Sequence, residues 1–208
     1  MSEPNGSCWS CRTSIAALDA FCPACGAVQP PRAASMFAIL GMPVQFEVDA
    51  AELERRYFAE QRRFHPDRFT GKPERERQFS MQHSTNVNEA YRVLGDPVRR
   101  AEHLLLLAGQ PARTVEETVR DPVILMRALE MREALAEAQS RAEIDGVLKA
   151  AKGEALACTA ELTKAFANAD LQCARTLTLQ LTYLQKFIEE ARERRTRVVG
   201  GQSAGAHS

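Results

Sequence analysis

Residues 49–73 have the sequence DAAELERRYFAEQRRFHPDRFTGKP, in which an amphipathic helix runs into a His-Pro-Asp tripeptide. Asp49 and Glu52 have the spacing of a capping box, which predicts the start of the helix. Pro66 predicts its end, because proline lacks the backbone N–H and restricts the residue before it. One face of this helix is apolar and the other basic, with Leu53, Tyr57 and Phe64 against Arg55, Arg56, Arg62 and Arg63.

A second helix is expected after Pro73, where apolar residues recur at steps of three and four from Phe79 to Leu94. Two helices joined by a short loop form an antiparallel hairpin, and the His-Pro-Asp tripeptide lies in that loop. A short apolar helix is expected before the pair, at residues 36–40, and a leucine-rich helix after it, ending near Gly109.

The C-terminal half predicts a three-helix bundle. Amphipathic stripes occupy about residues 122–139, 141–168 and 170–195. Outside the cysteine-rich segment at the N-terminus there is no useful strand-like alternation, so the expected fold is all-α with a small N-terminal zinc-knuckle module. The expected divisions are residues 1–31 for that module and its linker, 32–109 for the hairpin domain, 110–121 for a linker, 122–197 for the bundle and 198–208 for a disordered tail.

Composition limits the function classes. The chain has 208 residues, with 27 Lys and Arg against 27 Asp and Glu, so no global charge draws it to nucleic acid or to an anionic membrane. The longest apolar run, residues 104–108, is far too short to span a bilayer. The polar N-terminus offers neither a signal peptide nor a transit peptide. We therefore expect a cytoplasmic protein, or one of the mitochondrial matrix if a presequence has been removed.

Four cysteines form two C-x2-C pairs with ten residues between them: Cys8, Cys11, Cys22 and Cys25. Two such pairs closing on one ion are typical of a four-thiolate zinc site, and this sequence predicts one structural zinc. A redox dithiol or bound iron are lesser alternatives. The segment is too small to fold by apolar burial alone, so metal binding would supply its folding free energy. Cys158, Cys173 and His83 fall on or near core stripes and are interpreted as packing residues.

The hairpin with its loop tripeptide resembles a J-domain. Proline fixes the loop, while His65 and Asp67 offer polar groups beside a guanidinium-rich face that can pair with carboxylates of a partner. No nucleophile or oxyanion hole accompanies them, so we expect a docking surface and not an enzyme. The resemblance implies that His65, Pro66, Asp67, Arg55, Arg56, Arg62 and Arg63 bind a DnaK-type ATPase.

A more specific resemblance covers about residues 36–195. The segments FHPDRF (64–69), TNVNEAY (85–91), DPVRRAE (96–102) and TVRD (118–121) are similar to those of HscB, the J-protein family of iron–sulfur cluster biogenesis. This resemblance implies that the N-terminal domain stimulates an HscA-type chaperone. It also implies that the three-helix bundle binds an IscU-type scaffold and delivers it to that chaperone.

The helix from residue 122 carries two stripes. Ile124, Ala128, Met131 and Leu135 suit the bundle core, while acidic residues and spare apolar residues lie on the other side. That second face is either a partner surface or a solvated helix face, and the pattern alone does not distinguish between the two. The HscB resemblance implies scaffold contacts at Leu125, Met126, Leu129, Glu130, Glu133, Glu137 and Tyr183. For Tyr183 the sequence alone favours ordinary packing, with Leu179 and Phe187 on its face.

Three rival functions were weighed against this interpretation. A general J-domain co-chaperone in protein folding remains the alternative, although the Gly/Phe-rich segments and β-domains usual in that class are absent from the sequence. A thiol-disulfide oxidoreductase would need a βαβ pattern, which is missing. A zinc-ribbon nucleic-acid binder would need a basic patch, and Arg12 is the only cation between Cys8 and Cys25.

Overall fold

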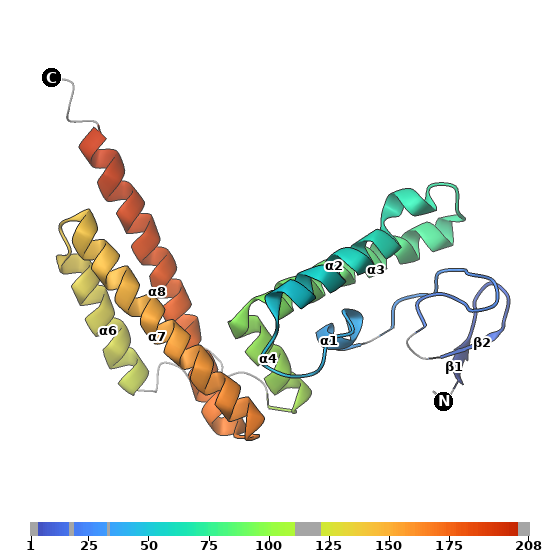
Figure 1. Cartoon of the computed structure of the whole chain (residues 1–208), viewed down its shortest axis with the longest axis horizontal. Helices are drawn as coiled ribbons and strands as arrows, with labels where there is room; N and C mark the ends of the chain where they lie inside the picture. The colour runs from blue at the N-terminus through green and yellow to red at the C-terminus, as the bar shows by residue number, and fades with distance from the viewer. Residues whose placement is uncertain (1–3, 17–18, 33, 111–121, 204–208) are drawn as a thin grey trace. The chain divides into compact units, whose positions relative to one another are not determined.

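The structure is a computed structural model that describes residues 4–16, 19–32, 34–110 and 122–203 (Figure 1). The chain separates into two compact units, Met1–Arg100 and Ala101–Ser208, each of which is described by itself. Helices dominate both units, which confirms the all-α class. None of the described helices is both long enough and apolar enough to cross a membrane.

The first unit begins with the small cysteine-rich module. Strands β1 (Pro4–Ser7) and β2 (Ser14–Ala16) pair antiparallel, with Ser7 opposite Ser14, and a single bridge joins Phe21 to Val28. Short helix α1 (Met36–Ile39) follows, as the sequence predicts. Gln29, directly before Pro30 and Pro31, is 1% exposed, and its side chain donates to Cys8 and to the carbonyl of Ala27 inside the module.

A helical hairpin forms the rest of the first unit. Helices α2 (Ala50–Phe64) and α3 (Glu74–Gly95) lie side by side and are joined through the 3-10 helix η1 (Pro66–Phe69) (Figure 1). Leu53 and Phe64 of α2 and Val87, Ala90 and Leu94 of α3 are buried. The apolar face that the sequence assigns to α2 therefore faces the partner helix.

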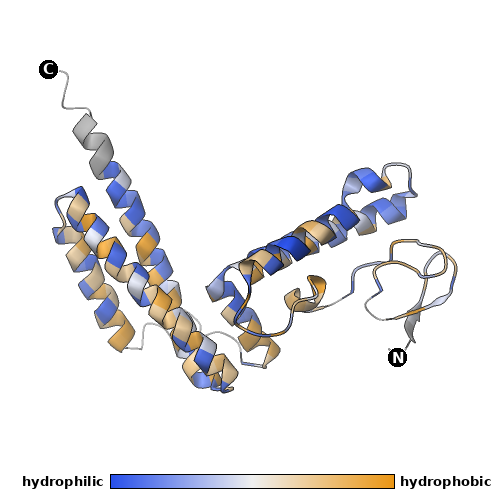
Figure 2. Cartoon of the chain, in the orientation of Figure 1, coloured by the Kyte–Doolittle hydropathy of each residue, from blue (hydrophilic) through white to orange (hydrophobic). Residues whose placement is uncertain are grey.

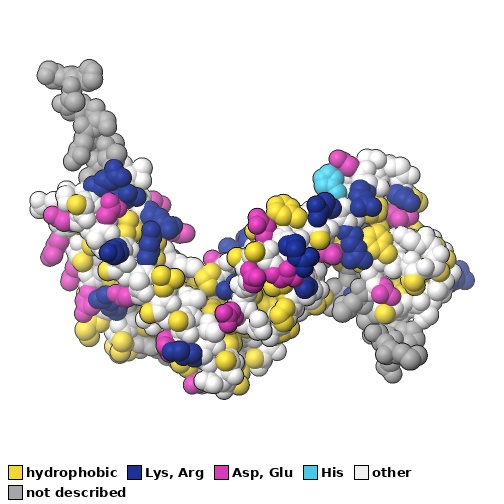
Figure 3. Space-filling view, in the orientation of Figure 1, with side chains coloured by type: hydrophobic (Ala, Val, Ile, Leu, Met, Phe, Trp, Pro, Cys, Tyr) yellow, Lys and Arg dark blue, Asp and Glu magenta, His cyan; other side chains and the backbone are white. Residues whose placement is uncertain are grey.

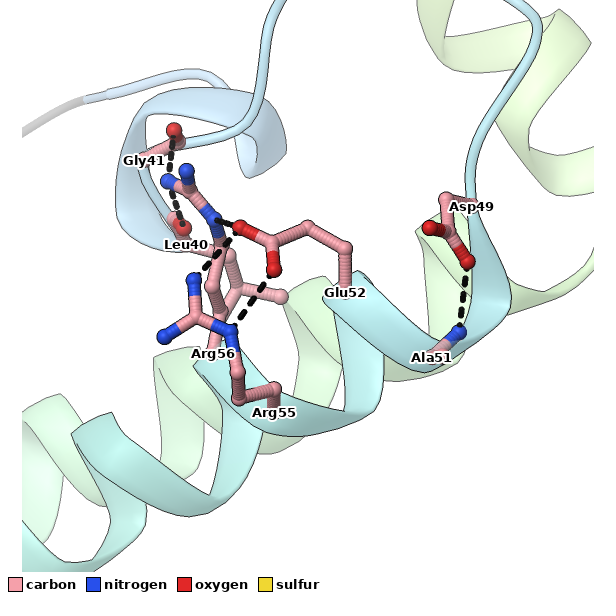
Figure 4. A network of polar contacts seen from close by, with 7 residues as sticks. All are labelled: Leu40, Gly41, Asp49, Ala51, Glu52, Arg55 and Arg56. Carbon is pink, nitrogen blue, oxygen red and sulfur yellow. Dashed lines mark hydrogen bonds and ion pairs between the residues drawn. The ribbon is translucent and has the colours of Figure 1, made fainter.

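The start of α2 differs in one detail from the predicted capping box. Asp49 does cap the helix, since its Oδ1 accepts a hydrogen bond from the N–H of Ala51 at 2.9 Å. Glu52, however, does not turn back to the cap, because its carboxylate binds Arg55 and Arg56 instead (Figure 4). Two guanidinium groups within one turn offer stronger, charge-assisted bonds than a backbone N–H does.

The bundle of the second unit consists of α6 (Pro122–Glu137), α7 (Arg141–Ala167) and α8 (Leu171–Ser203). Helix α4 (Pro97–Leu107) precedes it and contains the boundary between the units. Figure 2 shows apolar and polar residues alternating around the three bundle helices, as expected for amphipathic packing. The buried residues match the predicted stripes: Ile124, Met131, Leu135, Ile144, Leu148, Leu162, Leu181, Leu184, Ile188 and Ala191.

Three details of the bundle refine the sequence analysis. Cys158 is buried, which confirms its role in packing, but Cys173 is exposed in the first turn of α8, so the packing interpretation of Cys173 was wrong. Ser140 and Glu143 form a complete capping box at the start of α7. Helix α8 runs to Ser203, beyond the predicted start of the tail at residue 198, since no proline follows Arg195 to stop it. Residues 111–121 of the predicted linker (110–121) and the final residues, 204–208, lie outside the described residues.

Candidate functional site

His65, Pro66 and Asp67 lie at the exposed turn between α2 and η1. Pro66 occupies the first turn of η1, and α2 ends at Phe64 as the sequence predicts. The Nδ1 atom of His65 accepts a hydrogen bond from the N–H of Asp67 at 3.4 Å and lies 3.5 Å from its carboxylate. The side chains of His65 and Asp67 are 54% and 86% exposed. The turn therefore presents an imidazole and a carboxylate to any protein that docks there.

A basic depression adjoins this turn on the outer face of α2. Its lining includes Arg55, Arg62 and His65, all three expected from the sequence. Figure 3 shows Lys and Arg side chains gathered near a histidine on this part of the molecule. Three further lining residues were not predicted from the sequence: Phe58, Gln61 and Arg68. The helical spacing between Arg55 and His65 could have predicted Phe58 and Gln61, and the short return of the chain after Pro66 could have predicted Arg68.

Two of the predicted arginines have other contacts. Arg56 is half-buried and its guanidinium donates to the backbone carbonyls of Leu40 and Gly41, so it joins α2 to the end of α1 (Figure 4). The Arg63 guanidinium lies 4.8 Å from the ring centre of Phe21 in the cysteine-rich module. Neither residue lines the depression beside His65.

The four cysteines of the N-terminal pairs come together in space, as predicted. Their Sγ atoms all lie within 4.8 Å of one another, with Cys8 to Cys25 at 3.7 Å and Cys11 to Cys22 at 3.5 Å. Tetrahedral zinc with Zn–S bonds of about 2.3 Å would separate the sulfurs by about 3.8 Å. The spacing of the thiols therefore fits a single four-thiolate ion.

The backbone of the module supports such a site. Two matching turns close the C-x2-C pairs, with the N–H of Arg12 donating to Cys8 O and the N–H of Gly26 to Cys22 O, and Gly26 has φ of +71°. Burial raises the pKa of the Cys8 thiol. Hydrogen bonds from the N–H groups of Cys11 and Ser10, with the neighbouring thiols, lower it by more, so the pKa of Cys8 falls to about 6. Although the Ala27 backbone favours the Cys25 thiolate, burial and the neighbouring thiols raise the pKa of Cys25 to about 11. A cation bound among these four sulfurs would hold all of them as thiolates.

Helix α6 places the predicted scaffold-binding residues on its outer side. Leu125, Met126 and Leu129 are 39%, 62% and 58% exposed, while the core residues of the same helix are buried. Glu130 accepts a hydrogen bond from Arg127 at 2.9 Å. The other two acidic residues of this face are also exposed: Glu133 and Glu137. The structure thus combines exposed apolar side chains with carboxylates on one helix face.

Tyr183 belongs to α8 and does not lie on that face of α6. It is half-buried and lines a groove of about 330 Å³ that α6 residues such as Ala128 and Arg132 share with α8 residues such as Phe187. The ordinary packing that the sequence favours and the partner contact that the resemblance implies are both compatible with this position, since part of the side chain remains accessible.

Comparison with known proteins gives two family matches. Residues 35–103 match the DnaJ domain, and residues 120–192 match the HSCB C-terminal oligomerisation domain. The chain is 32% identical over 193 residues to the iron-sulfur cluster co-chaperone protein HscB of Mus musculus, covering 91% of this chain and 82% of the mouse protein.

Two solved structures resemble the chain over most of its length. The crystal structure of human co-chaperone protein HscB matches with a TM-score of 0.86 and 30% identity, covering 91% of this chain and 98% of the human one. The chaperone HscB from Vibrio cholerae matches with a TM-score of 0.72 and 31% identity, covering 79% of this chain and 99% of that one. The human match therefore extends over a larger share of the chain than the bacterial match does.

Proposed function

The chain belongs to the HscB family of J-domain co-chaperones, and we propose that it couples an iron–sulfur scaffold protein to an Hsp70-type ATPase. In this proposal the first unit stimulates ATP hydrolysis by a DnaK- or HscA-type chaperone, and the bundle delivers an IscU-type scaffold. The chain itself carries out no chemical step. The observation that carries the proposal is the presence in one chain of an exposed His-Pro-Asp turn and an exposed apolar-acidic helix face.

The chaperone would dock at His65, Pro66 and Asp67 and along the basic depression. Guanidinium groups bind carboxylates in a planar, two-pronged geometry, so arginines beside the turn suit an acidic partner surface. Phe58 is 51% exposed and adds an apolar side chain to the lining of this surface. Arg55, Arg62 and Arg68 supply the charge, whereas Arg56 and Arg63 act by holding α2 to its neighbours.

The scaffold would bind the outer face of α6. Covering exposed leucine and methionine side chains with a partner contributes favourable binding free energy. The surrounding carboxylates favour a partner with basic residues at the rim of the contact. The proposed contacts are Leu125, Met126, Leu129, Glu130, Glu133, Glu137 and Tyr183.

We also propose that the tetracysteine site holds one structural zinc ion. Zinc suits a closed tetrahedral set of four thiolates, and in small modules the binding of structural zinc supplies folding free energy. The proposed limits are 32–109 for the J-domain and 122–197 for the scaffold-binding bundle. Thiols held as metal ligands favour a reducing compartment, either the cytoplasm or the mitochondrial matrix after removal of a presequence.

A pull-down tests this function. The full chain, tagged at its C-terminus, is expected to retain both a DnaK-type ATPase and an IscU-type scaffold. Recovery of the ATPase together with a broad set of unfolded clients, and no scaffold, would instead support a general folding co-chaperone.

A further inference from the structure

The cysteine-rich module packs against the loop end of the α2–α3 hairpin within the first unit. Phe21 of the module stacks on Phe64, with ring centres 5.4 Å apart, and Trp9 meets Phe79 edge-on at 6.1 Å. The Arg75 guanidinium covers the Trp9 ring at 4.8 Å. Aromatic pairs of this kind add stabilisation beyond their buried area, so the contact is a packed interface.

Buried polar contacts reinforce the interface. Gln29 donates from Nε2 to the Cys8 Sγ at 3.3 Å, and its backbone carbonyl accepts from His83 Nε2 at 2.9 Å. Val28, which is fully buried, donates its N–H to the Glu76 carboxylate at 3.4 Å. Gln29 thus joins the thiol of Cys8 to helix α3, and Val28 adds a second hydrogen bond to that helix.

Phe64 receives this connection at the end of α2. The His83 ring stacks on Phe64 with centres 4.3 Å apart, and the buried Ser80 hydroxyl donates to the Phe64 carbonyl at 2.9 Å. Phe64 is therefore held by the module and by α3 together, and it is the residue before His65. Phe64 therefore connects these contacts to the start of the His-Pro-Asp turn.

The module has a small apolar core. Its described buried apolar residues are Cys8, Ile15, Cys22, Ala27 and Val28, and two of these are metal ligands in the proposed site. Loss of the ion would remove the bonds that hold the two C-x2-C turns to each other, and with them the surface that presents Phe21, Val28 and Gln29.

We propose that the tetracysteine module is a metal-dependent clamp on the J-domain hairpin. With the ion bound, the module fixes Phe64 and so preorganises the adjacent His-Pro-Asp turn; without it, the loop end of the hairpin opens locally. The clamp rests on the proposed zinc site, and its effect on chaperone stimulation rests on the proposed co-chaperone function.

Amide hydrogen exchange of the full chain tests the clamp. Zinc-loaded protein is compared with protein stripped by a chelator, with metal content measured in both. Several aromatic and hydrogen-bonded contacts are lost together, so protection of amides in residues 61–84 is expected to fall about ten- to hundredfold on stripping and to return with added zinc. Amides of α7 and α8 are the internal control and should not change.

Two variants separate the interface from metal binding. Phe21→Ala removes the stack on Phe64, and His83→Leu removes the bond to Gln29 while keeping a side chain of similar bulk. Both should retain zinc and lose about tenfold protection over residues 61–84, the loss expected for one packed contact or buried hydrogen bond. Gln82→Ala, at an exposed neighbour of His83, should lose none.

Equal protection of residues 61–84 in the zinc-loaded and stripped proteins would overturn the clamp, even if the module itself unfolded. The ATPase assay then distinguishes the two claims. If the clamp is correct, stripped protein stimulates the chaperone less than zinc-loaded protein does. If zinc-loaded protein gives no stimulation while the exchange result holds, the proposed function fails and the clamp stands.

Discussion

Replacing both Leu125 and Leu129 by alanine should weaken binding of an IscU-type scaffold by about ten- to hundredfold. The two side chains lie on the outer face of α6 and are 39% and 58% exposed. Because they are only partly packed in the free protein, their remaining apolar surface is available to a partner. The double substitution removes this surface from the proposed contact.

The magnitude follows from the exposed fractions. Fully burying a leucine side chain stabilises by about 1.5–3 kcal/mol, so covering the exposed parts contributes about 0.6–1.2 kcal/mol at Leu125 and about 0.9–1.7 kcal/mol at Leu129. Together these give about 1.5–3 kcal/mol, and each 1.4 kcal/mol or so corresponds to a tenfold change in Kd. Alanine retains the β-carbon, which places the expected change toward the lower end.

Isothermal titration calorimetry with a purified scaffold measures the change, and Leu156→Ala is the matched control. Leu156 is 73% exposed but lies on α7, outside the proposed face, so its truncation should leave Kd unaltered. Circular dichroism should show unchanged helical content in all three proteins. A double variant that binds as tightly as wild type would refute the assignment of this face, and so would an equal loss in Leu156→Ala.

Three further outcomes are expected. Metal analysis of purified protein should show about one zinc per chain, as one four-thiolate site requires; metal-free protein with a folded N-terminal module would disprove the site. Ser140→Ala should lower the free energy of unfolding by about 0.5–2 kcal/mol in chemical denaturation, because it removes the cap of α7, and an unchanged midpoint would contradict that. Hydrogen bonds from Arg55 and then Arg56 lower the pKa of Glu52 from 4.5 to about 2. The ionised Glu52 therefore stabilises the fold above pH 4.5, and this contribution is lost as the pH falls toward 2. Glu52→Gln should therefore reduce the acid sensitivity of unfolding across that range, and an identical pH profile would count against the pairing.

The elements that the sequence predicts best are those governed by local rules. Pro66 ends α2 at Phe64 because the backbone geometry of proline acts on its immediate neighbours. The core stripe of α6, from Ile124 to Leu135, follows from helical periodicity, which needs only one helix to be known. The C-x2-C spacing likewise predicts that four thiols meet, because the ligands of one ion must lie within a few ångströms of each other.

Features that depend on contacts distant in sequence could not be predicted. Gln29 precedes two prolines, yet it is buried, because its side chain bonds Cys8, 21 residues earlier, and its carbonyl meets His83 of α3. Arg63 belongs to the basic face by helical spacing, yet Phe21, more than 40 residues away in the chain, determines its position. Glu52 has the spacing of a capping residue, but competition from two neighbouring guanidinium groups decides its bonds.

The most direct test of the proposed function is the rate of ATP hydrolysis by a DnaK-type chaperone in the presence of this chain and an IscU-type scaffold. We expect the wild-type chain to raise the rate and His65→Gln to abolish the increase, with helical content and scaffold affinity intact, because His65 is an exposed residue of the proposed chaperone-binding turn and supports no part of the core. Full stimulation by His65→Gln, or none by the zinc-loaded wild-type chain, would contradict the account.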